Sequence, residues 1–125
     1  MKIGELSRIT GVSIRSLRHY EKQGLITPQR KPNGYREFTP IAVETVETIK
    51  LYLNLGLTTG QIAGFLTCVL QNKEAFCTQV MPVYRQKLAE IDKQIVELNQ
   101  IKANLTDRMN ALLQESQTTN HKEGE

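Results

Sequence analysis

The apolar residues in the first half of the chain recur every three or four positions, the period of a helix with one buried face. They predict short helices over residues 2–10, from residue 14 to Gly24, over residues 39–55, and from residue 58 onward. The residues that carry this spacing are Ile3, Leu6, Ile9, Leu17, Tyr20, Val43, Val46, Ile49, Leu53, Ile62, Phe65 and Leu66. The pattern therefore predicts a mainly α fold.

From residue 81 the pattern becomes one long apolar seam. Its members are Met81, Tyr84, Leu88, Ile91, Ile95, Leu98, Leu105, Met109 and Leu112. Lys102 interrupts the seam. A helix over residues 81–113 would be about 50 Å long at ~1.5 Å per residue, more than so small a domain can cover. The seam predicts a coiled coil, and the heptads alone leave open whether it is parallel, antiparallel or formed within one chain.

A turn-rich stretch lies between the second and third predicted helices. Asn33-Gly34 separates two short extended runs, residues 26–30 and 35–38, and is a strong signal for a β-hairpin. Upstream, Gly11 separates the first two helices, and Ser13 is placed to cap the second helix by accepting from a free backbone N–H. Two short helices joined by a tight turn and followed by a hairpin indicate a winged helix-turn-helix.

Positive charge is concentrated in the segment that holds this motif. The 125-residue chain has a net charge of +3. Residues 1–38 hold eight Lys or Arg against three Glu, whereas the remainder holds eight against ten Asp or Glu. A basic unit of this kind points to nucleic acid, and the second helix of the motif usually enters the major groove. The residues expected to contact DNA are Ser13, Arg15, Ser16, Arg18, His19, Tyr20, Arg30, Lys31, Tyr35 and Arg36.

Some of these residues have an alternative interpretation. Arg15 and Arg18 would also fit a basic helix face that is merely solvated. Tyr20 would also fit a core aromatic whose hydroxyl reaches solvent, because tyrosine serves both environments.

The same stretch of sequence carries a resemblance to a known family. The matching residues are Ile3-Gly4-Glu5-Leu6, Thr10-Gly11-Val12-Ser13, Leu17-Arg18, Tyr20-Glu21, Gly24-Leu25, Pro28, Arg30, Gly34-Tyr35-Arg36 and Phe38. Together they resemble the N-terminal domain of MerR-family transcription regulators. One departure is His19, which stands where the family usually carries a second aromatic residue that packs toward the DNA backbone.

The resemblance implies a division of the chain and a mode of action. Residues 1–72 would form the DNA-binding domain, and residues 73–113 a linker and an antiparallel coiled-coil dimerisation helix. Residues 114–125 are polar and are expected to be a disordered tail. The resemblance further implies a homodimer on a pseudo-palindromic promoter site, acting with RNA polymerase and switching transcription by distorting the DNA in response to an effector.

Expectations about the location of the protein and about cofactors come from features that the sequence lacks. No signal-type segment opens the chain, and no run approaches the ~18 apolar residues that a spanning helix needs. We therefore expect a cytoplasmic protein without a membrane partner, and no cofactor.

The two cysteines are the candidates for sensing an effector. In a reducing compartment, Cys68 and Cys77 are expected to be free thiols. The placement of Cys77 resembles the helix-start cysteine of mercury- and zinc-type regulators, but no cysteine follows the seam. Two thiols would hold a soft metal only if Cys77 met Cys68 or its symmetry mate, so no metal site is predicted. Oxidation or alkylation needs a single accessible thiol, and the alternative for Cys68 is a small buried residue.

Two other classes of protein compete with a regulator. An architectural, excisionase-like DNA-binding protein can share the winged motif but generally ends soon after the wing, so the long seam argues against it. An enzyme with Cys77 as nucleophile would need a positioned base, and the histidines of the chain are His19 in the reading helix and His121 in the tail. We therefore expect a non-enzymatic regulator that answers a thiol-reactive, metal or small-molecule signal.

Overall fold

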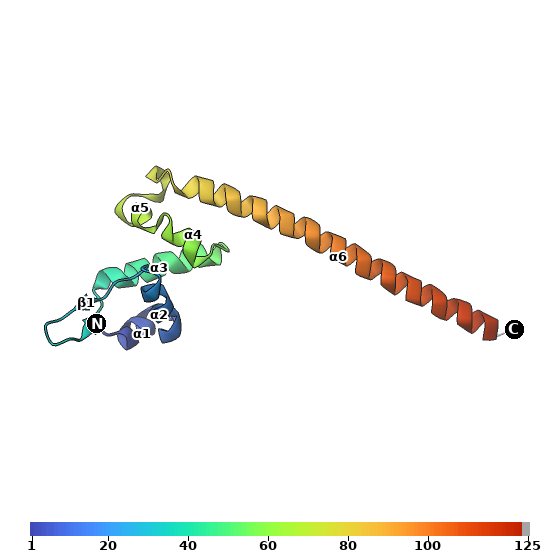
Figure 1. Ribbon diagram of the computed structural model, residues 1–125, viewed down its shortest axis with the longest axis horizontal. Coiled ribbons are helices and arrows are strands. Elements are labelled where there is room, and N and C mark those ends of the chain that lie inside the picture. Colours follow the sequence, from blue (N-terminus) through green and yellow to red (C-terminus); the bar gives the residue numbers. More distant parts are fainter. Residues whose placement is uncertain (124–125) are drawn as a thin grey trace. The chain divides into compact units, whose positions relative to one another are not determined.

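The computed structural model describes the backbone of residues 1–123 and the side chains of residues 1–118. Figure 1 shows the elements along the chain, most of them labelled, and the chain is mainly helical, as predicted. They are α1 (Ile3–Thr10), α2 (Ile14–Lys22), β1 (Gln29–Arg30), β2 (Arg36–Glu37), α3 (Pro40–Asn54), α4 (Thr59–Ala63), α5 (Leu66–Gln71), the 3-10 helix η1 (Glu74–Phe76) and α6 (Val80–Glu123). Residues Met1–Arg85 form one compact unit, and a second unit begins at Gln86.

Helices α1 and α2 pack against each other through a tight turn. Gly11 adopts φ +74°, a left-handed conformation that glycine tolerates best, and its N–H donates to the Ser7 carbonyl at 2.8 Å. Ser13 caps α2 as predicted, with its hydroxyl oxygen accepting from the Ser16 N–H at 3.1 Å. This geometry makes the helix-turn-helix.

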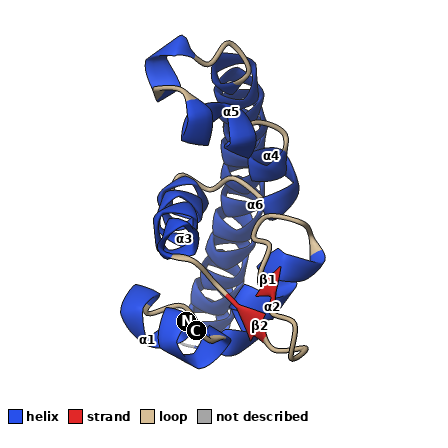
Figure 2. Cartoon of the chain, turned by 90° about the vertical axis from the view of Figure 1, so that its left-hand side faces the viewer, coloured by secondary structure: helices blue, strands red, loops and turns tan. Residues whose placement is uncertain are grey.

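The wing is a short hairpin, whose two strands are drawn in red in Figure 2. Strands β1 and β2 are antiparallel, with Gln29 opposite Glu37 and Arg30 opposite Arg36. Each strand has two residues, shorter than the extended runs that the sequence predicted. Gly34 turns the chain at φ +84°, in agreement with the Asn-Gly signal.

Helix α3 packs against both α1 and α4. Thr39 precedes it with Pro40 at its start, although the Thr39 side chain makes no capping hydrogen bond. Its buried residues are Ala42, Thr45, Val46, Ile49 and Tyr52. Val43 and Leu53, which were predicted to face inward, are only partly buried. The buried face is thus wider than a single apolar stripe, and the sequence pattern missed its small and polar members.

The segment after α3 contains two helices where one was predicted. Thr58 and Gln61 form the predicted capping box, with the Thr58 hydroxyl accepting from the Gln61 N–H at 3.1 Å and the Gln61 amide oxygen from the Thr58 N–H at 2.9 Å. Helix α4 ends at Ala63, next to Gly64, and α5 begins at Leu66. The predicted inward residues of this segment are buried: Ile62, Phe65 and Leu66.

One apolar core joins the elements of the first unit. At its centre Tyr52 and Phe65 pack edge to face, with ring centroids 4.8 Å apart. The beginning of α6 also belongs to this core, through Val80, Val83 and Tyr84. The DNA-binding motif and the start of α6 are therefore parts of one packed body.

Helix α6 is longer than predicted. It continues past Leu113, so residues 114–123 are helical where a disordered tail was expected. Their residue types include good helix formers such as Gln, Glu and Lys, which allow a helix without a buried face. Residues 124 and 125 lie outside the described part of the chain. Among the described residues, no helix combines the length and the apolar character needed to cross a bilayer.

Candidate nucleic-acid interface

Helix α2 divides cleanly into a buried face and a basic face. Leu17 is fully buried and Tyr20 is 6% exposed. The opposite face exposes Arg15, Arg18, His19 and Lys22. Burial also raises the pKa of the Tyr20 hydroxyl. The structure therefore places Tyr20 in the core, as its alternative interpretation held, and separates it from the other α2 residues expected at DNA.

The hydroxyl groups of the two serines at the start of α2 form a hydrogen bond with each other. Besides capping the helix, the Ser13 hydroxyl lies 3.0 Å from the Ser16 hydroxyl. Ser13 is exposed and Ser16 is half-buried. Both remain at the N-terminal end of α2, where free backbone N–H groups favour an anion such as a phosphate.

The wing carries the second group of expected contacts. Arg30, Lys31, Tyr35 and Arg36 are all exposed, with Tyr35 58% exposed. The Lys2 ammonium lies over the Tyr35 ring, 4.9 Å from its centroid, a cation–π arrangement. The N-terminal segment thus adds a cation beside the wing.

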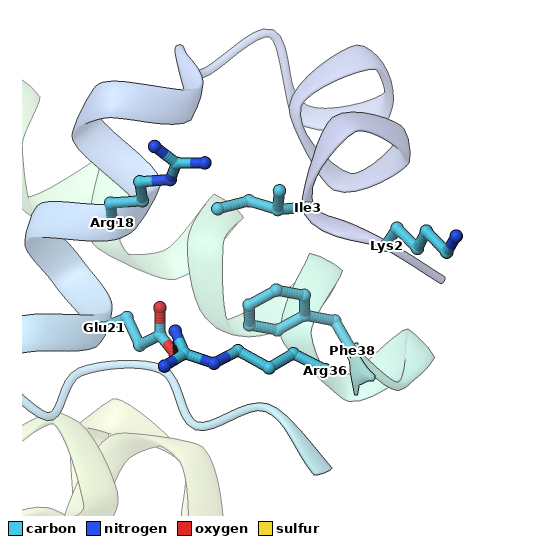
Figure 3. A pocket seen from close by; sticks show the side chains of 6 residues that line it. All are labelled: Lys2, Ile3, Arg18, Glu21, Arg36 and Phe38. Atoms are coloured by element: carbon cyan, nitrogen blue, oxygen red, sulfur yellow. Dashed lines mark hydrogen bonds and ion pairs between the residues drawn. The ribbon is translucent and has the colours of Figure 1, made fainter. Parts of the chain in front are cut away.

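Helix α2 and the wing are joined by an ion pair. The Arg36 guanidinium donates to the Glu21 carboxylate at 3.0 Å, as Figure 3 shows from close by. Around this pair lies a cavity of about 200 Å³. It is lined by Lys2, Ile3, Arg18, Glu21, Arg36 and Phe38. Three cations against one carboxylate leave this concave surface positive, which suits a phosphate backbone.

A contact from α3 supports the turn of the helix-turn-helix. The Lys50 ammonium donates to the Thr10 carbonyl at 2.7 Å and lies 3.4 Å from the Glu47 carboxylate. Thr10 ends α1, where free carbonyls attract a cation. Helix α3 therefore holds the C-terminal end of α1, immediately before the Gly11 turn.

The cysteines differ from expectation, because the structure pairs Cys68 and Cys77 in a disulfide. Their Cα atoms are 5.9 Å apart, within the range that a disulfide spans. The chain folds back after α5: the Asn72 N–H donates to the Cys68 carbonyl at 2.9 Å, and the Cys77 N–H to the Glu74 carbonyl at 3.0 Å. These local turns, which the sequence did not signal, bring the two sulfurs together. The prediction of two free thiols is thus wrong for this structure.

Sequence reasoning missed three residues of these sites. Lys2 and Glu21 line the cavity, and Glu74 lies in the loop between the cysteines. A signal for Glu21 was available, since Tyr20-Glu21 is part of the family motif quoted above. Lys2 and Glu74 depend on long-range packing that no local pattern announces.

The fold and the basic surface define a winged helix-turn-helix DNA-binding protein. Residues 1–67 match the family model described as MerR HTH family regulatory protein, and residues 43–108 match the model described as MerR, DNA binding. The chain therefore belongs to the MerR family of helix-turn-helix transcriptional regulators, which bind promoter DNA.

Similar proteins agree with this assignment. The HTH-type transcriptional regulator HmrR of Rhizobium leguminosarum bv. viciae is 31% identical over 89% of this chain and 85% of its own length. The mercuric resistance operon regulatory protein of Bacillus cereus is 34% identical over 85% of this chain and 80% of its own length. Among solved structures, the transcription regulator PbrR691 of Ralstonia metallidurans CH34, crystallised with lead(II), has a TM-score of 0.75 at 23% identity, covering 86% of this chain and 83% of its own. The last comparison concerns the fold.

Proposed function

We propose that the protein binds promoter DNA as a homodimer, with α2 in the major groove and the wing beside it, and controls transcription in response to a signal received at Cys68 and Cys77. The observation that carries the DNA-binding part is the joint between α2 and the wing. There Arg18 and Arg36 line one positive cavity. A guanidinium can make a bidentate contact to guanine or to a phosphate.

The remaining exposed residues extend this surface in two directions. On α2, Arg15 and His19 flank Arg18, and on the wing Arg30 and Lys31 follow the hairpin. We assign base reading to the α2 residues, because the second helix of the motif is the one that enters the groove. We assign phosphate contacts to the wing, which fixes the protein on the duplex without reading sequence.

Homodimer formation is supported by the exposed seam of α6. Large apolar side chains that are about half exposed or more recur along it: Leu88, Ile95, Leu98, Leu105, Met109 and Leu112. A row of this kind is costly in water and is covered by a partner helix in a coiled coil. As in the family, we propose an antiparallel pairing that presents two reading heads to a pseudo-palindromic site used by RNA polymerase.

Operator binding by alanine variants tests the DNA-binding surface. Arg18→Ala and Arg36→Ala are compared with wild type by fluorescence anisotropy on the DNA upstream of the gene, over a range of salt concentrations. A lost base contact lowers operator affinity by about 1 to 3 kcal/mol, whereas a lost phosphate contact weakens binding to all sequences and reduces the salt slope by about 1. Arg85→Ala is the matched control, because Arg85 is exposed on α6 outside the cavity. Unchanged affinity and salt slope in both test variants would reject the surface.

The nature of the signal is supported by the relatives. One is named a mercuric resistance regulator, and a 32% identical protein of Haemophilus influenzae is named a probable heavy metal-dependent transcriptional regulator. In this chain the Cα atoms of Cys68 and Cys77 are 5.9 Å apart, so reduction of their disulfide would leave two neighbouring thiols for a soft ion that accepts two thiolates. Sulfur-to-metal charge-transfer absorbance on adding Hg(II) or Cu(I) to the reduced protein, absent in Cys77→Ser, is the expected result. Equal absorbance in both proteins would contradict it.

A further inference from the structure

The loop between α5 and α6 is held at two places. The first is the bond between Cys68 of α5 and Cys77, which lies just after η1. The cysteines are nine positions apart, so the bond closes a small ring within one chain. Cys77 is 6% exposed, whereas Cys68 is only half-buried. Cys68 is therefore the sulfur that a reagent in solution reaches more easily.

The second place is Glu74, inside that ring. One oxygen of its carboxylate accepts a hydrogen bond from the Tyr52 hydroxyl and the other accepts one from the Tyr84 hydroxyl, each at 3.0 Å. Tyr52 is a core residue of α3, and Tyr84 lies near the start of α6. Glu74 thus connects the ring to both helices.

Helix α3 connects this ring to the DNA-binding motif, because it carries a contact to each of them. Tyr52 and Lys50 are two residues apart on α3, and Lys50 donates to the Thr10 carbonyl at the end of α1. Thr10 immediately precedes the turn into α2. A rigid helix that contacts both ends makes coupling physically possible, and a measurement of coupling tests it.

We propose that Cys68 and Cys77 form a dithiol–disulfide switch that responds to small-molecule disulfides, and that Glu74 is the positioning residue through which its state reaches α3 and α6. The inference rests on the proposed function, because its output is promoter control. It adds to that function a redox input that needs only the two sulfurs of one chain. Metal coordination by the same thiols instead needs an ion of matching geometry.

The chemistry is a pair of thiol–disulfide exchanges. The Cys68 thiolate attacks a disulfide RSSR, forming a mixed disulfide and releasing RS⁻. The Cys77 thiolate then attacks the Cys68 sulfur of that mixed disulfide, which forms the Cys68–Cys77 bond and releases the second RS⁻. The protein loses two electrons and two protons, and RSSR becomes two RSH. Excess thiol reverses both steps.

The test uses the full-length protein in glutathione buffers of graded redox poise. Thiol state is read by maleimide labelling and mass spectrometry, and promoter output by in vitro transcription and operator anisotropy. We expect glutathione disulfide to produce one intrachain disulfide and to change transcription or operator affinity at least about fivefold, the lower end of ordinary coupling between sites. Cys68→Ser, Cys77→Ser and the double variant should bind the operator and show no redox response.

Glu74→Gln tests the positioning role. This variant should still form the disulfide but lose most of the redox ratio, which is the ratio of transcription or operator affinity between the oxidised and the reduced protein. In the double-serine background, Glu74→Gln should change nothing further. Tyr84→Phe, which removes one hydrogen bond and keeps the carboxylate, should reduce the ratio less. Glu97→Gln is the control, because Glu97 is an exposed acid of α6 outside the ring. Equal ratios in Glu74→Gln and wild type would overturn the assignment of Glu74.

Three results separate this inference from the proposed function. A disulfide that forms without changing transcription or affinity would overturn the switch and leave the regulator intact. A response to Hg(II) or Cu(I) in the complete absence of a response to glutathione disulfide would do the same. Failure to bind promoter DNA in either redox state would instead overturn the proposed function itself.

Discussion

The Arg36 guanidinium of the wing lies 3.0 Å from the Glu21 carboxylate of α2, so the strand and the reading helix are joined across the positive cavity. The Glu21 side chain is 19% exposed and that of Arg36 is 56% exposed. A pair this open to solvent contributes little to stability. We expect the pair to act mainly by fixing where the Arg36 guanidinium points.

Glu21→Gln should therefore alter DNA recognition more than folding. The free energy of unfolding should fall by less than about 1 kcal/mol, since exposed pairs are weak. Removal of a negative charge strengthens non-specific binding, while the released Arg36 loses its fixed position. The ratio of operator to non-operator affinity should decrease, as measured by anisotropy on both DNAs at one salt concentration. An unchanged ratio would show that Glu21 does not position the wing.

Alkaline pH should weaken the contacts around Glu74. Burial, followed by the Glu74 carboxylate, raises the pKa of Tyr84 to about 12 and raises that of Tyr52 as well. The contribution of the Tyr84 hydroxyl to stability is fully present below its ordinary pKa of about 10 and is lost as the pH rises through about 12, and the contribution of Tyr52 changes with pH in the same direction.

Tyrosinate absorbance during a pH titration should show that Tyr20, Tyr52 and Tyr84 ionise later than free tyrosine. Glu74→Gln should lower the pKa of Tyr52 and Tyr84 and leave that of Tyr20 unchanged. Titration of all tyrosines near pH ~10 in the native protein would contradict this prediction.

Reduction of the disulfide should destabilise the first compact unit. A disulfide that closes a ring of this size stabilises the folded state by about 2 to 3 kcal/mol, because it reduces the conformational entropy of the unfolded chain. Urea unfolding with and without reductant should show that loss in wild type. Cys77→Ser should show no dependence on reductant, which separates the bond from other effects of the reagent.

A charge in the α6 seam should dissociate the proposed homodimer. Leu98→Asp should raise the dimer dissociation constant by at least about a hundredfold, because a buried leucine is worth ~2 kcal/mol and a homodimer loses two. Sedimentation equilibrium measures the change. Gln100→Asp, an exposed polar position two residues away, adds the same charge as a control and should remain dimeric. A dimeric Leu98→Asp would place the interface elsewhere.

The elements that sequence predicted well are those with local chemistry. Ser13, Thr58 and Gly34 act within three residues of themselves, so their caps and turn follow from neighbouring residue types. The helical spacing of apolar residues predicted α2 and placed Arg15 and Arg18 away from its buried face. The excess of Lys and Arg in the first 38 residues pointed to the same segment.

What sequence missed depends on contacts between distant segments. Tyr20 lies in the core because the core extends under α2. Its position in the helical pattern fits a core residue and a surface residue equally well. The pairing of Cys68 with Cys77 depends on the turns after α5. The expectation of free thiols came from the compartment, which says nothing about whether two sulfurs lie within reach.

Because Cys68 and Cys77 belong to one short ring, each sulfur sees the other at a high effective concentration that dilution does not change. Oxidation of one subunit then needs no encounter with another molecule of the protein. A cell holding a few copies and a cell holding thousands would reach the same oxidised fraction at the same thiol-to-disulfide ratio. The threshold of the response would be a property of the surrounding small molecules and independent of how strongly the gene is expressed.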